Sequence, residues 1–292
     1  MMPTYRKHAA QGGMAIDVAG RLWVYAIWAV TIWFVVNLLA LIGSVVVSSF
    51  STRWLRSWFP DGLTLRWYRS AWSEFQLGEV LSTTFTVVGA VVVLAGLLGV
   101  PAAYALARRD FPGKRWIMLL FLLPLMVPPV TYGIPLATVL YQAGPGGTIW
   151  GVILANLVPT VPFVILVMIP FIEQVDPRIE AAARIFGART PQLFIHVLLP
   201  MLAPGILAAL LLVMVRTIAM FELTFLTAGP TSQTLVVALY YSVFASGVRA
   251  VQSIDAMAVI YMAITLVWLL IALRFVNPTQ LVSRVKRSDQ AN

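Results

Sequence analysis

Long stretches without a charged residue set the strongest constraint on what this chain can fold into. None of Asp, Glu, Lys or Arg occurs in 22–52, 80–107, 116–172, 190–215, 223–248 or 256–273. About 20 apolar residues are enough for a helix to cross the hydrocarbon core of a bilayer. The sequence therefore predicts an all-α, polytopic membrane protein and excludes an ordinary water-soluble domain.

The segment 116–172 is too long for a single helix. The motif "YQAGPGG" at 141–147 interrupts it with turn-forming Gly and Pro, so we expect two spans there and six in all. The apolar stretch of the first span is about twice the length of the apolar region of a secretory signal and lacks a small-residue cleavage site, so this span is not expected to be a cleaved signal. The expected spans are 22–49, 80–107, 116–141, 148–171, 198–227 and 256–274.

The distribution of basic residues predicts the orientation of these spans. With both termini and the second and fourth loops on one side, that side collects most of the 20 Lys and Arg residues. Basic loops remain cytoplasmic. We therefore expect a cytoplasmic tail at 1–21, a six-span domain at 22–275, a cytoplasmic loop within it at 173–197, and a cytoplasmic tail at 276–292. The net charge of +9 then reports topology, and no nucleic-acid partner is predicted.

No set of residues with the spacing of a catalytic or metal site is found. The chain has no Cys and only two His residues, and His8 and His196 do not stand at ligand spacing from one another. The phosphate-binding pattern Gly-x4-Gly-Lys-Ser/Thr is absent from the sequence. We predict no catalytic residue, no cofactor and no metal, and the chain cannot itself hold ATP phosphates through that motif.

The loop at 173–197 carries the motif "DPRIEAAARIFG", which predicts a short helix with both ends specified. Asp176 suits the cap that precedes a helix, Pro177 its first position, and Gly187 the left-handed residue that follows the last turn. Glu180 and Arg184 stand four residues apart in the favourable order for an ion pair. A second helix is expected to begin with Thr190 as its cap and Pro191 as its first residue, and to lead back into the membrane.

One face of the first of these helices is predicted to be apolar and narrow, because small residues make up most of it. A connector lying along lipid headgroups and a helix that fits a protein groove both remain open. A lipid-surface helix gains from large apolar side chains, whereas alanines permit close approach by another protein, so the groove is favoured. The face is formed by Ile179, Ala182, Ala183 and Phe186.

These motifs resemble the permease subunits of binding-protein-dependent ABC importers. The family's loop pattern is Glu-Ala-Ala, three residues, Gly, nine residues, Ile or Val, one residue, Leu-Pro. The chain departs from it with Ala181 at the glutamate position and has Glu180 one residue earlier. The segments 99–114, 176–188 and 221–240 resemble the family as well. The residues that match the loop pattern are Ala182, Ala183, Gly187, Val197, Leu199 and Pro200.

The resemblance implies the type I importer permease fold in the bacterial inner membrane. It implies an ATP-binding subunit dimer, a second permease subunit and a periplasmic solute-binding protein as partners. The segments 63–72 and 225–230 resemble the polyamine/opine/phosphonate (spermidine/putrescine-type) branch. By this resemblance the cytoplasmic loop couples the chain to the ATPase through Glu180, Ala182, Ala183, Arg184, Phe186 and Gly187.

Two ionisable residues at membrane depth, Arg216 and Glu222, are both expected in the fifth span. Such residues usually face a cavity or a partner, so each is a candidate for the solute path or for a structural contact. Neutral polar candidates are Tyr132, Asn156 and Thr224, which equally suit hydrogen bonds between helices. The prolines of spans three and four permit kinks, as a moving permease needs.

The loop at 231–255 is expected at the external mouth. Lipid anchoring is favoured for the Trp-rich segment 50–79. The alternative function is an autonomous secondary carrier or channel, for which internal repeats and several intramembrane charges are expected. A membrane-embedded enzyme is the third class, and the sequence offers no cluster of reactive side chains for it.

Overall fold

The computed structural model describes residues 6–54, 60–244 and 250–275, with side chains from residue 20 onward. The elements in these ranges are helices, as expected, together with an isolated β-bridge between Ser51 and Leu63. The chain divides into two units, residues 1–67 and 68–292. Each unit is described by itself.

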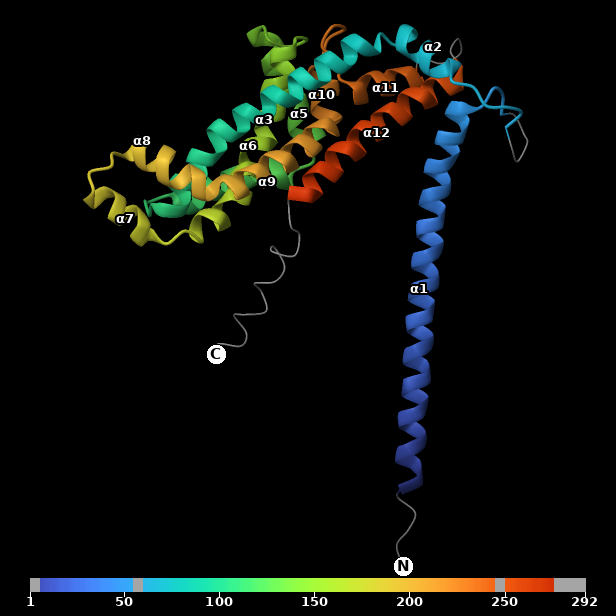
Figure 1. Cartoon of the computed structure of the whole chain (residues 1–292), viewed down its shortest axis with the longest axis horizontal. Helices are drawn as coiled ribbons and strands as arrows, with labels where there is room; N and C mark the ends of the chain where they lie inside the picture. Colours follow the sequence, from blue (N-terminus) through green and yellow to red (C-terminus); the bar gives the residue numbers. More distant parts are fainter. Residues whose placement is uncertain (1–5, 55–59, 245–249, 276–292) are drawn as a thin grey trace, which may run out of the picture. The chain divides into compact units, whose positions relative to one another are not determined.

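The first unit is dominated by α1 (Arg6–Phe50), the long helix coloured blue in Figure 1. From Gly20 to Phe50 it is long and apolar enough to cross a membrane, and the most apolar part of this segment is not buried against the rest of the described chain. Trp23, Trp28 and Trp33 are each more than 60% exposed. A helix that is apolar on every side requires an apolar environment around it, which a bilayer or another membrane protein supplies.

The core of the second unit lies between three helices, α3 (Leu77–Arg108), α6 (Ile149–Glu173) and α9 (Leu199–Ile218). α3 and α6 form the most extensive helix pair, and both also pack against α9. These helices run side by side in Figure 1, with α12 (Val251–Phe275) along α9. The buried side chains between them include Val91, Ala95, Val164, Ile165, Met168, Leu202 and Val213.

The expected third span is sharply bent rather than straight. α4 (Lys114–Met126) and α5 (Pro129–Ala143) meet at 101°. The residue before a proline is pushed out of the helical region by the proline ring, and Val127 and Pro128 both precede a proline. Their ψ angles of 136° and 133° are extended. Two successive extended residues end one helix and let the next begin in another direction.

The expected fifth span, 198–227, is wrong at its C-terminal end. A continuous helical segment runs from Thr190 to Ile218, comprising α8 (Thr190–Leu193), a π-helical stretch (Phe194–Leu198) and α9. The chain then breaks, and a separate short helix, α10 (Glu222–Thr227), follows. Glu222 therefore opens a new helix instead of lying inside the span.

The start of α8 is also shifted by one residue from the prediction. Thr190 is the first helical residue, and Arg189 is the residue that precedes the helix. The Arg189 backbone N–H donates to the Gln192 side-chain oxygen at 2.9 Å. Arg189 therefore stands at the cap position that the sequence predicts for Thr190.

The two ends of the second unit carry different short helices. α7 (Pro177–Ile185) lies at the end where α3 terminates, and α11 (Leu235–Phe244) lies toward the opposite end (Figure 1). The backbone N–H of Leu235, at the start of α11, donates to the Thr84 hydroxyl of α3 at 2.8 Å, and this contact is buried. α3 therefore holds α11 at one end and reaches α7 at the other.

Among the described residues, five helices are long and apolar enough to span a membrane, and α4 with α5 makes a sixth if the bent pair is one span. The spans are α1, α3, α6, the segment from Thr190 to Ile218, and α12. The fold is the all-α polytopic membrane fold that the sequence predicts.

Close packing of α3 on α6 depends on Gly99. A Cβ atom there would lie 2.7 Å from Val164 Cγ1 and 2.8 Å from Val164 Cβ. We expect Gly99→Ala to separate the helices and destabilise the protein by about 1–3 kcal/mol, as overpacking commonly does. The loss is measured as a lower midpoint in thermal unfolding of the detergent-purified protein.

Gly89→Ala, on the same helix, is the matched control. Nothing lies within 4 Å of a Cβ atom at Gly89, so the better helix propensity of alanine should leave stability unchanged or raised by up to about 1 kcal/mol. Equal effects of the two substitutions would contradict the packing that the structure shows.

Candidate functional site

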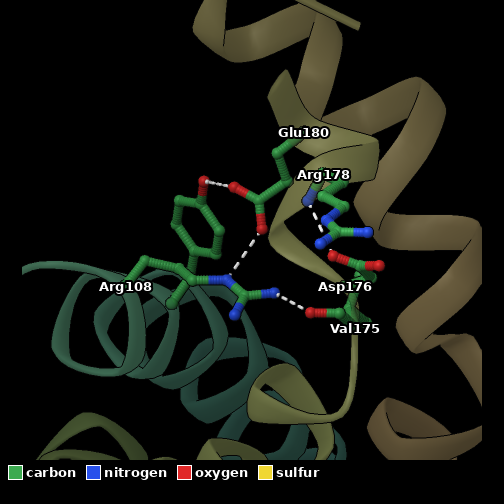
Figure 2. Close-up of polar contacts among 6 residues, drawn as sticks. Arg108, Val175, Asp176, Arg178 and Glu180 are labelled. Atoms are coloured by element: carbon green, nitrogen blue, oxygen red, sulfur yellow. Dashed lines mark hydrogen bonds and ion pairs between the residues drawn. The ribbon is translucent and has the colours of Figure 1, made fainter. Parts of the chain in front are cut away.

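The N-terminus of α7 is capped as the sequence predicts. The Asp176 carboxylate accepts a hydrogen bond from the Arg178 backbone N–H at 2.9 Å (Figure 2). Pro177 stands in the first turn, where its missing N–H leaves no donor without a partner. The helix therefore begins at a position that local sequence alone specifies.

The C-terminus of α7 is likewise closed as predicted. Gly187 has a φ of +86°, in the left-handed region. Its N–H donates to the Arg184 carbonyl at 3.0 Å, and the Ala188 N–H donates to the Ala183 carbonyl at 3.0 Å. This pair of bonds is the Schellman arrangement, so the chain leaves the helix in one defined direction.

A buried polar anchor fixes α7 to the end of α3. Glu180 is only 7% exposed. It accepts hydrogen bonds from the Tyr104 hydroxyl and from Arg108 Nε, each at 2.7 Å. Arg108 also donates through its terminal nitrogen to the Val175 carbonyl at 2.5 Å. Figure 2 shows Arg108, at the end of α3, between Glu180 and the Val175 carbonyl.

The ion pair of Glu180 differs from the one predicted. Its partner in the structure is Arg108, on another helix, rather than Arg184 one turn away. The side chains of the pair are 13% and 9% exposed. Removing one partner from a buried ion pair costs about 3–5 kcal/mol because the other charge is left uncompensated. The anchor therefore resists rotation of α7.

The large apolar side chains of this loop gather at the end of α7 rather than along a stripe. Ile185 is 84% exposed and Phe186 is 91% exposed, whereas Ala183 is half-buried and packs against the core. Of the predicted face, Ile179, Ala182 and Phe186 are exposed and Ala183 is half-buried. Ile185 and Phe186 together form what we call the apolar tip.

A second group of candidate residues meets where α6 faces α10. The Asn156 amide nitrogen donates to the Val152 carbonyl at 2.8 Å and to the Thr224 hydroxyl at 3.2 Å. The first of these bonds fixes which side of the amide carries oxygen. The Asn156 oxygen is buried and has no hydrogen-bond partner within the described ranges. An acceptor left in this way requires an explanation, such as an ordered water or a ligand.

Three of the remaining candidates lie near one another. Tyr132, on α5, is close enough to Arg216 and Glu222 to sense both charges electrostatically. Its hydroxyl is buried and unpartnered in the described part of the chain. Arg216 lies over the Phe163 ring, 5.1 Å from its centroid. The structure therefore pairs Asn156 with Thr224 and brings Tyr132 near Arg216 and Glu222. We call these five candidates, which come from four helices, the polar cluster.

A pocket of about 280 Å³ lies at the end of the unit opposite α7. Its lining includes Glu74 at the end of α2 (Arg66–Glu74), Gln76 in the turn that follows and Glu79 at the start of α3. Gln233 and Tyr241 line it from the loop that was expected at the external mouth. Gln76 has a φ of +48°, an uncommon conformation for a residue other than glycine.

Three residues that shape the α7 region were not predicted from the sequence: Tyr104, Arg108 and Ile185. Tyr104 and Arg108 lie more than 70 positions from Glu180 in the chain, and their pairing arises from tertiary packing. The sequence did contain one indication of this pairing, because Arg108 is a charged residue at the predicted end of a span. Ile185 was not predicted because it lies outside the apolar helical face that was expected to include Phe186, although it directly precedes Phe186 in the sequence.

The chain is similar in sequence to known membrane transport proteins. The model of the family described as "Binding-protein-dependent transport system inner membrane component" matches residues 95–287. A diacetylchitobiose uptake system permease protein of Streptomyces coelicolor is 30% identical over 187 residues, covering 64% of this chain and 60% of that protein. A probable molybdenum ABC transporter permease protein of Haloferax volcanii is 34% identical over 166 residues, covering 54% of this chain and 61% of that protein.

The matched region thus spans about 60% of the length of these two curated relatives. Among solved structures, a bacterial ABC transporter involved in import of the acidic polysaccharide alginate aligns with a TM-score of 0.69 and 17% identity, covering 94% of this chain and 99% of that one. This likeness supports the fold. The family match covers most of the chain and contains α7, α6 and the polar cluster. The chain belongs to the family of binding-protein-dependent transport system inner membrane components.

Proposed function

We propose that the chain is the permease subunit of an ATP-driven importer and forms half of a solute path across the membrane. The single observation that carries this proposal is the exposed apolar tip on an anchored helix. Two large apolar side chains that are more than 80% exposed on a rigid support suit a protein partner, because docking removes them from water. In this proposal the partner is a dimer of ATP-binding subunits.

The other half of the path is a second permease chain or a copy of this one. A solute-binding protein on the outer side delivers the cargo. A related alginate transporter structure contains a periplasmic protein bound to an alginate pentasaccharide, and we extend that arrangement to this chain. The polar pocket beside Tyr241 lies at the end of the unit where such a protein would dock.

The orientation follows from the charges at the α7 end. Arg108, Arg109, Lys114 and Arg115 lie at the end of α3 and the start of α4, on the same side as the arginines of the α7 loop. The positive-inside rule then puts this end in the cytoplasm. ATP is available there, and the chain itself lacks a phosphate-binding motif, so hydrolysis falls to the partner.

The cargo that we propose is a saccharide-type solute. The unpaired Asn156 oxygen needs a hydrogen-bond donor. A sugar hydroxyl supplies one, whereas molybdate and sulfate are fully deprotonated at neutral pH and offer only acceptors. The polyamine/opine/phosphonate branch, inferred from 63–72 and 225–230, stays a prediction. Amines would also donate to Asn156, but two of the relatives are named as permeases for diacetylchitobiose and for trehalose.

Access to the polar cluster requires movement. Its unpaired oxygens on Asn156 and Tyr132 are sealed from solvent in this conformation. A solute therefore reaches them only when the surrounding helices separate, as alternating access requires. The break between α9 and α10 and the bend between α4 and α5 lie next to the cluster and can accommodate such a change.

Phe186→Asp should abolish docking of the ATP-binding subunit. Burying a phenylalanine contributes roughly 1.5–3 kcal/mol, so losing it should weaken association at least about tenfold, before the cost of burying a carboxylate. The measurement is co-purification of the two subunits in detergent. Phe186→Leu keeps the tip apolar and is the matched control. Normal co-purification of Phe186→Asp would exclude the tip as the docking point and leave an autonomous carrier or channel as the better function.

Asn156→Leu should stop uptake while the protein still folds. The change removes an unsatisfied buried acceptor together with the bonds to the Val152 carbonyl and the Thr224 hydroxyl, so stability should shift by no more than about 1–2 kcal/mol. Uptake is measured in cells that express the whole transporter, with labelled disaccharide and labelled molybdate as the two probes. Thr160→Val is the control, because the Thr160 hydroxyl bonds only to the backbone of its own helix at 2.6 Å. Molybdate uptake that survives Asn156→Leu would overturn the saccharide assignment.

A further inference from the structure

A groove of about 670 Å³ lies at the corner where α3 passes into α4. Neither the α7 anchor nor the polar cluster contributes a residue to its lining. One part of the lining is charged and consists of Asp110, Lys114 and Arg115, whereas the rest is apolar. The groove is therefore a feature separate from the sites described above, and it combines charged groups with an apolar wall.

The apolar wall follows one face of α4, starting at Arg115. Met118, Leu119 and Leu122 line the groove and stand three, four and seven residues after this arginine. Residues at such spacings lie on the same side of a helix. At 1.5 Å per residue, the wall extends about 10 Å from Arg115 to Leu122. A positive charge thus stands at one end of an apolar strip.

The positive charge at this end of the groove is only partly balanced. Lys114 Nζ lies 3.0 Å from Asp110 Oδ1, but the Asp110 side chain is 99% exposed, and an exposed ion pair is weak. The Arg115 side chain is exposed and has no ion pair or hydrogen bond with any residue that the structure describes. Because two cations face one carboxylate, the complementary ligand is an anion.

α4 places this groove at the edge of the membrane. No residue of α4 is buried in the described chain, and Leu120 and Leu123 are more than half exposed. An apolar helix with such a surface requires apolar surroundings. Trp116, near the start of α4, is 75% exposed, and tryptophan prefers the depth of the lipid headgroups. Headgroups therefore meet the charged end of the groove, and acyl chains meet its wall.

We propose that this groove binds an anionic phospholipid, whose phosphate lies at Lys114 and Arg115. One acyl chain lies along the wall formed by Met118, Leu119 and Leu122. A phospholipid fits both parts of the groove because it carries a phosphate and an apolar chain in one molecule, and basic pockets at the cytoplasmic side of membrane proteins suit such headgroups. Free phosphate would leave the apolar wall uncovered. The site does not depend on the proposed function.

The bound lipid adjoins the corner that carries the α7 anchor. Arg108, which pairs with Glu180, is the last residue of α3, and Asp110 in the groove follows two residues later. A ligand that binds the folded chain and not the unfolded one stabilises the fold. Occupancy of the groove should therefore raise the melting temperature of the protein.

Lipid retention measures the site directly. The full-length chain is purified in detergent, phosphatidylglycerol or phosphatidylcholine is added, and the lipids that stay bound are counted by native mass spectrometry. We expect one phosphatidylglycerol per chain to be retained at least about fivefold more strongly than phosphatidylcholine, with a higher melting temperature. Equal retention of the two lipids would overturn the proposal.

Substitution of the two cations tests the place of the phosphate. Lys114→Gln combined with Arg115→Gln should weaken phosphatidylglycerol binding at least about tenfold, because each basic residue near an anionic headgroup contributes a factor of about five. Arg115→Lys keeps the charge and should retain binding, which separates loss of the cation from a folding defect. No loss in the double variant would contradict the assignment.

Arg109→Gln is the matched control for the charged end. Arg109 is exposed and belongs to the same basic corner, but it does not line the groove. Its substitution should leave phosphatidylglycerol retention unchanged. An equal loss in Arg109→Gln and in the double variant would mean that the whole corner attracts anionic lipid diffusely, and a defined site would be excluded.

Leu119→Ala tests the place of the acyl chain. Truncation of this side chain removes part of the apolar wall, so phosphatidylglycerol binding should weaken about threefold. Leu120→Ala is the control, because Leu120 is 63% exposed on the same helix and does not line the groove. If both substitutions had the same effect, the acyl chain would have no defined place along α4 and the proposal would fail.

Two further measurements examine other occupants. Inorganic phosphate in excess should neither displace bound phosphatidylglycerol nor raise the melting temperature. If it does both, the groove is a site for free phosphate and the lipid assignment is overturned. Addition of the ATP-binding subunit or of a second permease chain should leave the lipid bound. Displacement of the lipid by either protein would identify the groove as a protein interface and overturn the proposal as well.

Discussion

The buried pairing of Glu180 with Arg108 and Tyr104 is the interaction on which the position of α7 and its exposed tip depends. An isolated helix of nine residues is not stable in water, because helix nucleation is costly and few hydrogen bonds follow it. α7 has nine residues and stands outside the spans. Its two caps define where it begins and ends, but only tertiary contacts can fix its direction. The anchor supplies those contacts, so the exposed tip becomes part of a rigid surface.

Local features were predictable and tertiary ones were not. The caps at Asp176 and Gly187 involve neighbours within five residues, so the sequence contains all the information that they need. The partner of Glu180 lies 72 positions away, and the choice between Arg184 and Arg108 is decided by burial, which raises the value of a well-placed counter-charge. The fold class followed from the apolar runs alone, since lipid leaves the backbone few ways to satisfy its hydrogen bonds.

The predictions for the third and fifth spans differ from the structure for one physical reason. Hydropathy marks what can lie in lipid, but it does not tell a straight helix from a broken one. The 101° bend between α4 and α5 follows from two successive residues that precede prolines, a stereochemical effect that apolarity conceals. The end of α9 before Glu222 falls where the apolar run is interrupted by a charge. Both breaks adjoin residues of the polar cluster.

α3 gives the molecule a direct mechanical connection between its two ends. It is one helix of 32 residues, with Tyr104 and Arg108 holding α7 at one end and Thr84 holding the start of α11 at the other. Glu79 and Thr83 of the same helix line the polar pocket beside α11. Its close contact with α6 at Gly99 leaves little room for α3 to bend. We therefore expect a displacement of α7 to move α3 as a rod and to reach the pocket without passing through the broken spans, which remain free to open around the polar cluster.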